Sequence, residues 1–304
     1  QRALLEVAAK PAAVRDAAGY GVRLPGGSEV DFPAVMERMR ELRAEIGPND
    51  SAERFKDLGI DVFLGAGRFK DAATIEVAGK ELKFAKAVIA TGGRAIVLPI
   101  PGLKEAGALT NETLFSLTER PRRFAVIGAG PIGCEMAQAF ARLGSEVTLF
   151  EAQCKILPRE DSDAAKIVEA ALERDGVRTI CDARIEQVER ERDLRTIRLE
   201  HEGKTKTWEF DQILVGVGRA PNVEGIGLEA AGVDFDKRKG VSVDAQLRTS
   251  NPKIFAVGDV AMDDKFTHMA DATARIVIQN ALFKGRKKHT DLLVPWCTYT
   301  QPEI

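Results

Sequence analysis

The sequence predicts an α/β protein, because three of its segments place short apolar strands directly before glycine-rich turns. In the segment 124–151, an apolar strand enters Gly-Ala-Gly-Pro-Ile-Gly, a helical pattern follows, and a second strand, 147–150, precedes Glu151. In the segment 249–260, the strand 254–257 ends in Gly-Asp, and in the segment 88–93 a strand ends in Ala-Thr-Gly-Gly. Strands that alternate with helices indicate a parallel sheet covered by helices.

The run from Gly128 to Gly133 has the G-x-G-x-x-G spacing between a strand and a helix, which is the context of a dinucleotide-binding turn. Gly128 allows a tight turn, Gly130 lets the backbone approach a pyrophosphate, and Gly133 lets the helix pack close to the strand. Pro131 and Ile132 open a helix whose free N–H groups and dipole favour phosphate. The alternative is a glycine-rich turn that binds no ligand.

The carboxylate of Glu151 predicts the choice of coenzyme. Glu151 ends the second strand, eighteen residues after Gly133, close to the spacing of the acidic residue that binds an adenosine ribose. A carboxylate accepts hydrogen bonds from a ribose diol and repels a 2′-phosphate. NAD is therefore favoured, and NADP is the less favoured alternative because Lys155 lies near.

Local patterns predict the other elements. Residues 1–46 are expected to form two helices, the second with an apolar face from Phe32 to Ile46. Further helices are expected at 51–58, near 112–117, at 161–175 and at 270–283. Strands are expected at 61–64, 74–77, 81–84 and 87–90, with a hairpin turn at 78–80, and a further strand hairpin spans 185–210.

Composition excludes several classes of function. The 304 residues suffice for about two domains, and a 44% hydrophobic and 30% charged content is typical of a globular chain. The net charge is −2, and the one basic run, 284–289, is expected to follow a helix end, so no nucleic-acid partner is expected. We see neither an apolar run of about 18 residues nor a secretory leader, so no membrane partner is expected.

The cysteines and histidines form no spaced set that would predict a metal site or a redox pair. The four cysteines are scattered, which suits a reducing cytosol: Cys134, Cys154, Cys181 and Cys297. Cys134 lies at the start of the helix after the glycine turn, where it is either an activated thiol or a small buried packing group. The three histidines are too dispersed to bind a metal together.

Taken in order, the motifs resemble those of the pyridine nucleotide-disulfide oxidoreductases, a family of FAD-dependent disulfide reductases. The resemblance rests on ATGG at 90–93, IPG at 100–102, the glycine motif at 128–151, GVGRAPN at 216–222, IFAVGDV at 254–260, FTHMA at 266–270 and YTQPEI at 299–304. A mercuric reductase-like or dihydrolipoamide dehydrogenase-like member is indicated by ALLEVAAK at 3–10, NDSAERF at 49–55 and VPWCTYTQPEI at 294–304.

The resemblance implies two Rossmann-like dinucleotide-binding domains, with the NAD domain inserted into the FAD domain and a β-meander. The implied divisions are the first FAD part at 1–119, the NAD domain at 120–241, the second FAD part at 242–290 and the start of an interface domain at 291–304. Against the family pattern, the chain is expected to be truncated at both ends. The flavin's own G-x-G-x-x-G unit, the C-x-x-x-x-C redox pair and the catalytic His-Glu pair are absent from it.

The resemblance also implies roles for single residues. Glu135 matches the family's glutamate beside the nicotinamide and flavin, and its alternative role is a charge that complements the helix dipole. Gly218 is expected on the NAD side, and Asp259 is expected to bind the ribityl hydroxyls of FAD. The remaining residues expected to contact FAD are Thr91, Gly92, Gly258, Met269 and Ala270.

The expected function is relay of hydride from NADH through FAD to a redox disulfide, and then to a mercuric ion or a disulfide substrate. The chain by itself is expected to lack turnover. Two alternatives stay open: an NAD-binding fragment, and a cysteine-independent NADH:quinone or rubredoxin-type flavoprotein reductase. The expected partner is a small-molecule or metal-ion substrate, the longer protein is expected to be a homodimer, and the expected location is the cytoplasm.

Overall fold

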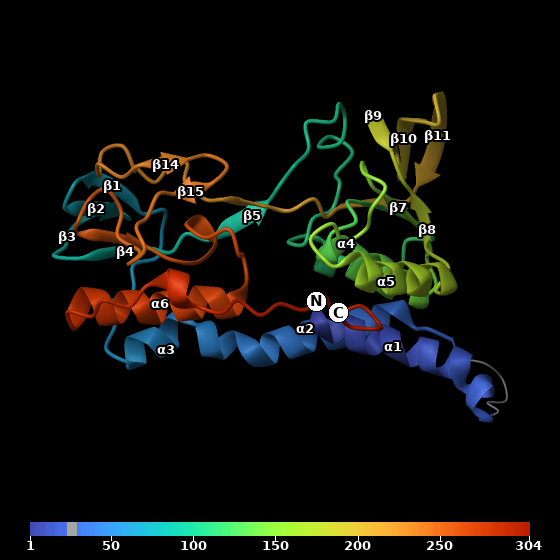
Figure 1. Cartoon of the computed structure of the whole chain (residues 1–304), viewed down its shortest axis with the longest axis horizontal. Coiled ribbons are helices and arrows are strands. Elements are labelled where there is room, and N and C mark those ends of the chain that lie inside the picture. The colour runs from blue at the N-terminus through green and yellow to red at the C-terminus, as the bar shows by residue number, and fades with distance from the viewer. Residues whose placement is uncertain (23–28) are drawn as a thin grey trace. The chain divides into compact units, whose positions relative to one another are not determined.

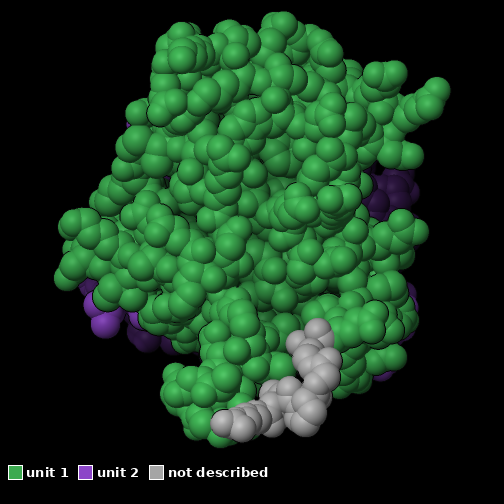
Figure 2. All heavy atoms as spheres, turned by 90° about the vertical axis from the view of Figure 1, so that its right-hand side faces the viewer, with its two compact units in different colours: residues 1–49, 95–218, 297–304 green, residues 50–94, 219–296 purple. Residues whose placement is uncertain are grey.

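The computed structural model describes residues 1–22 and 29–304 of the chain (Figure 1). They divide into two compact units. Unit 1 comprises residues 1–49, 95–218 and 297–304, and unit 2 comprises residues 50–94 and 219–296. In the space-filling view, the atoms of unit 1 form one continuous surface although they come from three separate stretches of chain (Figure 2).

Unit 1 is built on a four-stranded parallel sheet. Its order is β12 (Gln212–Val215), β6 (Arg123–Ile127), β7 (Glu146–Phe150) and β8 (Arg178–Ile180). β6 lies in the middle of the sheet, where Val126 is paired with Leu149 on one side and with Leu214 on the other. The carboxyl ends of these strands therefore meet at one edge, where open α/β sheets bind ligands.

Helices cover one face of this sheet: α1 (Arg2–Asp16), α2 (Phe32–Ile46), α4 (Pro131–Arg142) and α5 (Ser162–Arg174). Phe124 and Val126 of β6 point to this face, and the ring of Phe140 from α4 stacks on Phe124 with centroids 4.4 Å apart. The ring of Phe32, the first residue of α2, lies 5.8 Å from that of Phe140, and α1 packs on α4 (Figure 1). The two N-terminal helices thus share the core of the glycine-rich turn.

The opposite face of the sheet is covered by an antiparallel meander, β9 (Arg184–Glu191), β10 (Leu194–His201) and β11 (Lys204–Phe210). Ala125 and Ile127 of β6 point to this face, because successive side chains of a strand alternate between its faces. The ring of Phe150 from β7 meets that of Phe210 edge-on at 5.8 Å. The sheet is therefore buried on both sides, as its nearly continuous apolar strands require.

Unit 2 contains small sheets around two apolar clusters. β1 (Arg68–Asp71), β2 (Thr74–Val77) and β3 (Lys80–Lys83) are antiparallel, and β16 (Ile254–Ala256) runs parallel to β4 (Ala87–Ile89). β13 (Arg219–Pro221) pairs with β5 (Gly93–Ala95), and β14 (Phe235–Asp236) pairs with β15 (Gly240–Val241). The helices are α3 (Ala52–Asp57) and α6 (Thr267–Leu282).

Short 3-10 turns complete the chain: Ala17–Tyr20, Gly47–Asp50, Leu114–Ser116, Gly258–Val260 and His289–Asp291. The helix expected near 112–117 is only the third of these turns. The helix expected at 270–283 begins three residues earlier, and the hairpin expected at 185–210 carries a third strand. The two helices expected in residues 1–46 are present, although residues 23–28 between them lie outside the described chain.

The prediction of a strand at residues 61–64 is wrong. The run is Asp-Val-Phe-Leu, but these residues form no strand, and Phe63 and Leu64 are exposed. The strand that pairs with β2 is β1, whose Phe69 lies opposite Ile75. An apolar run becomes a strand only where a neighbouring strand accepts its hydrogen bonds, and that pairing is not visible in local sequence.

The compact units do not coincide with the divisions expected from the sequence, because residues 1–49 pack with the glycine-rich turn of unit 1. The assignment of FAD and NAD domains therefore stays a prediction.

Candidate functional site: a glycine turn at the sheet edge

Gly128 makes the turn at the end of β6. Its φ is +100°, a conformation that favours glycine, and its N–H donates to the carbonyl of Phe150 at 2.8 Å. A Cβ at this position would lie 2.9 Å from the carbonyl oxygen of Gly216 and 2.9 Å from Cγ1 of Val217. Both the dihedral angle and the close approach of the chain after β12 therefore require glycine.

Gly133 and Gly130 differ in what surrounds them. A Cβ on Gly133 would lie 1.8 Å from the carbonyl oxygen of Gly128, so glycine is needed there for the helix to pack on the turn. A Cβ on Gly130 would have no neighbour closer than the carbonyl oxygen of Gly216 at 4.0 Å. Packing of the described residues gives no reason for glycine at position 130, whereas a phosphate group close to the backbone would give one.

Helix α4 begins at this open space. Gly130 is its N-cap and Pro131 its first residue, and no described side chain makes a capping hydrogen bond to it. Proline suits this position because the first N–H of a helix has no partner within the helix. The N-terminal amides and the positive end of the helix dipole suit an anion, and Ile132 and Gly133 follow in the first turn.

The carboxylate of Glu151 lies beside the same turn. Its Oε2 accepts a hydrogen bond from the backbone N–H of Ala129 at 2.8 Å, and its Oε1 accepts one from that of Gln153 at 3.0 Å. Each oxygen keeps acceptor capacity for a further donor. A partly buried carboxylate beside an open helix N-terminus fits a molecule that joins a hydroxyl-bearing sugar to a phosphate.

Gly218 also lies in unit 1, close after β12. Its φ is +119°, and its carbonyl accepts a hydrogen bond from the N–H of Ile96 at 3.0 Å. Val217, the residue before Gly218, lies against the turn at Gly128. Gly218 is therefore close to the turn that is predicted to bind NAD.

Glu135 is buried one turn further along α4, with 4% of its surface exposed. Its Oε1 accepts a hydrogen bond from the backbone N–H of Tyr299 at 2.9 Å, and its Oε2 contacts Nε2 of Gln1. Burial raises the pKa of Glu135, and the hydrogen bonds from Tyr299 and Gln1 oppose that rise. The structure thus places this carboxyl in contact with both Gln1 and Tyr299. Its role beside a nicotinamide stays a prediction.

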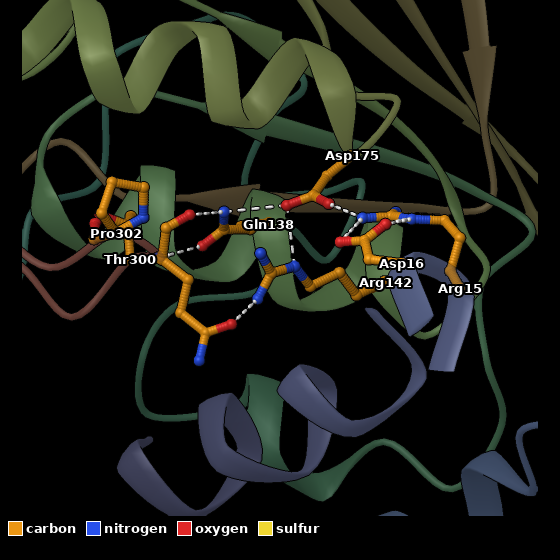
Figure 3. A network of polar contacts seen from close by, with 8 residues as sticks. Arg15, Asp16, Gln138, Arg142, Asp175, Thr300 and Pro302 are labelled. Carbon is orange, nitrogen blue, oxygen red and sulfur yellow. Dashed lines mark hydrogen bonds and ion pairs between the residues drawn. The ribbon is translucent and has the colours of Figure 1, made fainter. Parts of the chain in front are cut away.

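A buried polar network next to Glu135 was not predicted from sequence (Figure 3). Asp175, whose side chain is wholly buried, accepts hydrogen bonds from Gln138 at 2.9 Å, Arg142 at 2.8 Å and Arg15 at 2.8 Å. Gln138 also accepts from the backbone N–H of Gln301 at 2.8 Å and donates to its carbonyl at 2.9 Å. The network therefore ties α1, the end of α5 and the C-terminal segment to α4.

The residues expected to contact FAD gather in unit 2. Asp259 lies in the 3-10 turn after β16, and its Oδ2 lies 3.2 Å from Nε of Arg219. A Cβ on Gly93 would approach Oδ2 of Asp259 to 3.4 Å, so the ATGG turn lies beside this carboxylate. Gly258 has a φ of +68°, and a Cβ there would lie 3.1 Å from Cβ of Ala270.

Two further polar residues of unit 2 hold these turns, although the sequence motifs did not indicate them. Asn222 donates to the carbonyl of Thr91 at 2.9 Å and accepts at its own carbonyl from the Thr91 hydroxyl at 2.7 Å, and its N–H donates to the Gly92 carbonyl at 3.0 Å. The buried hydroxyl of Thr273 accepts from the N–H of Gly258 at 3.3 Å and donates to the Met269 carbonyl at 2.8 Å. Asn222 could have been found in the GVGRAPN motif, whereas a threonine inside a helix gives no such signal.

The thiols occupy different environments. Cys134 is wholly buried, and burial raises its pKa to about 12, which fits a packing group. Cys154 is exposed, and its thiol donates to Oδ2 of Asp182 at 3.2 Å. The neighbouring Asp182 and, after it, Cys181 raise the pKa of the Cys154 thiol to about 12. All four cysteines are free thiols in the structure.

Within residues 1–22 and 29–304, no group of three or more histidine, cysteine or acidic side chains is arranged to hold a metal ion. In the same part of the chain, no helix is long and apolar enough to cross a membrane.

Several known proteins are similar to this chain in sequence or in structure. Residues 14–278 match the pyridine nucleotide-disulphide oxidoreductase family. The chain belongs to this family. The mercuric reductase of Lysinibacillus sphaericus is 34% identical over 277 residues, which cover 91% of this chain and 50% of that protein. The dihydrolipoyl dehydrogenase of Bacillus subtilis (strain 168) is 33% identical over 310 residues, which cover 100% of this chain and 66% of that protein.

The solved structure of the HOCl-induced flavoprotein disulfide reductase RclA from Escherichia coli is similar, with a TM-score of 0.86 and 28% identity over 99% of this chain and 65% of that one. The two-domain dinucleotide-binding fold expected from the sequence is confirmed by these similarities. Pyridine nucleotide-disulphide oxidoreductases use FAD and NAD(P)H. The chain spans about half the length of the mercuric reductase and two thirds of the length of the other relatives named here.

Proposed function

We propose that this chain binds NADH at the turn of residues 128–133 and contributes to an FAD site, as part of an oxidoreductase that passes hydride from NADH through FAD to a disulfide or a mercuric ion. The observation that carries the proposal is the open space over Gly130, at an uncapped helix N-terminus beside the carboxylate of Glu151. FAD, when bound, would accept the hydride and pass two electrons onward.

The chain's own residues would bind and orient the coenzyme. The N-terminal amides of α4 would bind the pyrophosphate, and Glu151 would accept hydrogen bonds from the adenosine ribose. The carboxylate would repel the 2′-phosphate of NADPH, so NADH would be the tighter ligand. Gly218, joined through Val217 to the same turn, would border the bound coenzyme.

In unit 2, Asp259 would accept hydrogen bonds from the ribityl hydroxyls of FAD, with Arg219 holding the carboxylate in place. The backbone of Thr91, Gly92, Gly258, Met269 and Ala270 would form the surrounding contacts. A Cβ on Gly92 would meet nothing within 4 Å, so this backbone, like that of Gly130, has room for a ligand.

The dihydrolipoyl dehydrogenase and mercuric reductase relatives support two substrate classes, a small disulfide and a mercuric ion. The 304 residues contain no C-x-x-x-x-C pair. We therefore expect the 304-residue chain to bind NADH without turning over either substrate, and we propose a homodimer for the longer protein.

The test is a fluorescence titration of the 304-residue chain with NADH and with NADPH, followed by an NADH oxidation assay with added FAD, disulfides and Hg(II). We expect saturable NADH binding, weaker NADPH binding and no substrate-dependent oxidation. Absence of NADH binding by the folded chain would refute the proposed coenzyme site. Turnover that disappears when one of the four cysteines is changed to serine would show that a redox thiol lies within this chain.

A further inference from the structure

Two side chains of α4 bind the main chain of one short segment, residues 299–301. The carboxylate of Glu135 accepts a hydrogen bond from the N–H of Tyr299 at 2.9 Å. Three residues later, Gln138 accepts one from the N–H of Gln301 at 2.8 Å and donates one to the carbonyl of Gln301 at 2.9 Å. Residues three apart lie on the same face of a helix, so one segment can contact both side chains.

This segment belongs to a loop that is closed by its own backbone. Thr298 and Ile304 exchange two backbone hydrogen bonds, of 2.8 and 3.2 Å, and Thr298 is wholly buried. Residues 298–304 therefore cannot move independently of one another. A contact that fixes the main chain of Gln301 also restricts the position of Tyr299, two residues earlier.

The orientation of Gln138 is itself fixed, because every polar group of its amide has a partner. The residue is 2% exposed, and its nitrogen also donates to Oδ2 of Asp175 at 2.9 Å. Asp175 is held in turn by Arg142 and Arg15 (Figure 3). Turning the amide of Gln138 over would set its oxygen against two acceptors and its nitrogen against an N–H group, so a single orientation satisfies the site.

We propose that Gln138 is a positioning residue for Glu135. By binding the main chain of Gln301 through two hydrogen bonds, it holds the N–H of Tyr299 against the carboxylate of Glu135 and so fixes the direction in which that carboxylate points. The role expected of Glu135 beside a nicotinamide rests on the proposed function. The chain of hydrogen bonds from Gln138 to Glu135 needs no bound coenzyme, so it can be tested separately.

The arrangement connects the proposed coenzyme site to the segment 299–301. The first turn of α4 is the proposed pyrophosphate site, and Glu135 follows in the same helix. A functional side chain acts in one geometry when its orientation is locked by the hydrogen bonds of its neighbours. Gln138 would therefore affect the coenzyme through Glu135 without touching it.

The experiment compares Gln138→Met with two control variants of the 304-residue chain, and circular dichroism checks that each is folded. Methionine is of similar length and cannot make the two hydrogen bonds to Gln301. The first control, Gln301→Ala, keeps these bonds because they involve main-chain atoms. The second control, Phe140→Leu, weakens the apolar core of the same helix and changes none of the polar contacts.

Nuclear magnetic resonance provides two readouts that a general loss of stability would not produce. Hydrogen exchange at the amide of Tyr299 should become at least about tenfold faster in Gln138→Met, because local opening no longer breaks the bonds of Gln138. The pKa of Glu135, followed at its carboxyl carbon, should rise, because the Tyr299 hydrogen bond that lowers it is weakened. The nearby titratable groups are the same in all variants: the amino group of Gln1 and the thiols of Cys134 and Cys297.

Both changes are expected in Gln138→Met and neither in the two controls. Unaltered exchange and titration in the folded methionine variant would overturn the proposal, and so would equal changes in Phe140→Leu. The unchanged chain gives a check that needs no variant, because one opening should expose the amides of Tyr299 and Gln301 together. Exchange at Tyr299 more than about tenfold faster than at Gln301 would contradict the proposal. Failure of the unchanged chain to bind NADH would refute the proposed function and leave these results standing.

Discussion

The substitution Glu151→Gln tests the role of this carboxylate in coenzyme choice. In the structure its two oxygens already accept from the N–H groups of Ala129 and Gln153, so an added ribose would use their remaining lone pairs. A hydrogen bond to a charged group contributes about 1.5–3 kcal/mol. At about 1.4 kcal/mol per factor of ten, loss of one such bond should weaken NADH binding roughly 10- to 150-fold.

NADPH binding should weaken less or improve, because the amide no longer repels a 2′-phosphate. Fluorescence titration of both coenzymes gives the ratio of their dissociation constants, and urea unfolding reports whether the turn has kept its stability. Glu146→Gln is the matched control, since Glu146 begins the strand that Glu151 follows and its exposed side chain forms an ion pair with Arg122. Tighter binding of NADPH than NADH by the unchanged chain would refute the reasoning, and so would an unaltered ratio in Glu151→Gln.

Three further substitutions test other parts of the structure. Burial raises the pKa of Glu135 above its ordinary 4.5, so its stabilising contribution is complete below that pH and is lost as pH rises through the raised pKa. Glu135→Gln should therefore remove this part of the pH dependence of the unfolding free energy, and an unchanged pH profile would count against it. Asp175→Asn leaves buried Arg142 without this charged partner and should cost about 3–5 kcal/mol in urea unfolding, whereas exposed Asp16→Asn should cost much less; equal losses would contradict the account. Asp259→Asn should lower FAD affinity about tenfold or more by equilibrium dialysis, while the surface variant Asp271→Asn should not, and equal affinities would remove Asp259 from the flavin site.

The glycine turn could be predicted from sequence because its determinants are local. Gly128 needs a positive φ, and Gly133 needs contact with a carbonyl five residues earlier, so spacing alone encodes the geometry. The apolar run at 124–127 likewise predicted a strand, although not that Phe124 and Val126 face the helices while Ala125 and Ile127 face the meander.

The features that could not be predicted depend on residues far apart in the chain. Asp175 has the sequence context of an exposed charge at a helix end, yet its side chain is buried by groups from α1 and α4. Packing of Phe32 against Phe140 likewise joins segments that local periodicity treats separately.

The measurement that tests the central claim most directly is NADH affinity in Gly130→Ala compared with Gly133→Ala. Gly130 has a φ of −75°, and an added Cβ would meet nothing closer than 4.0 Å, so alanine should change the unfolding free energy by about 1 kcal/mol or less. Alanine at Gly133 would place its Cβ 1.8 Å from a backbone oxygen and should strongly destabilise the fold. If a pyrophosphate occupies the space over Gly130, its alanine variant should stay folded and bind NADH at least about tenfold more weakly. A folded Gly130→Ala chain that binds NADH as tightly as the unchanged chain would contradict the proposed coenzyme site.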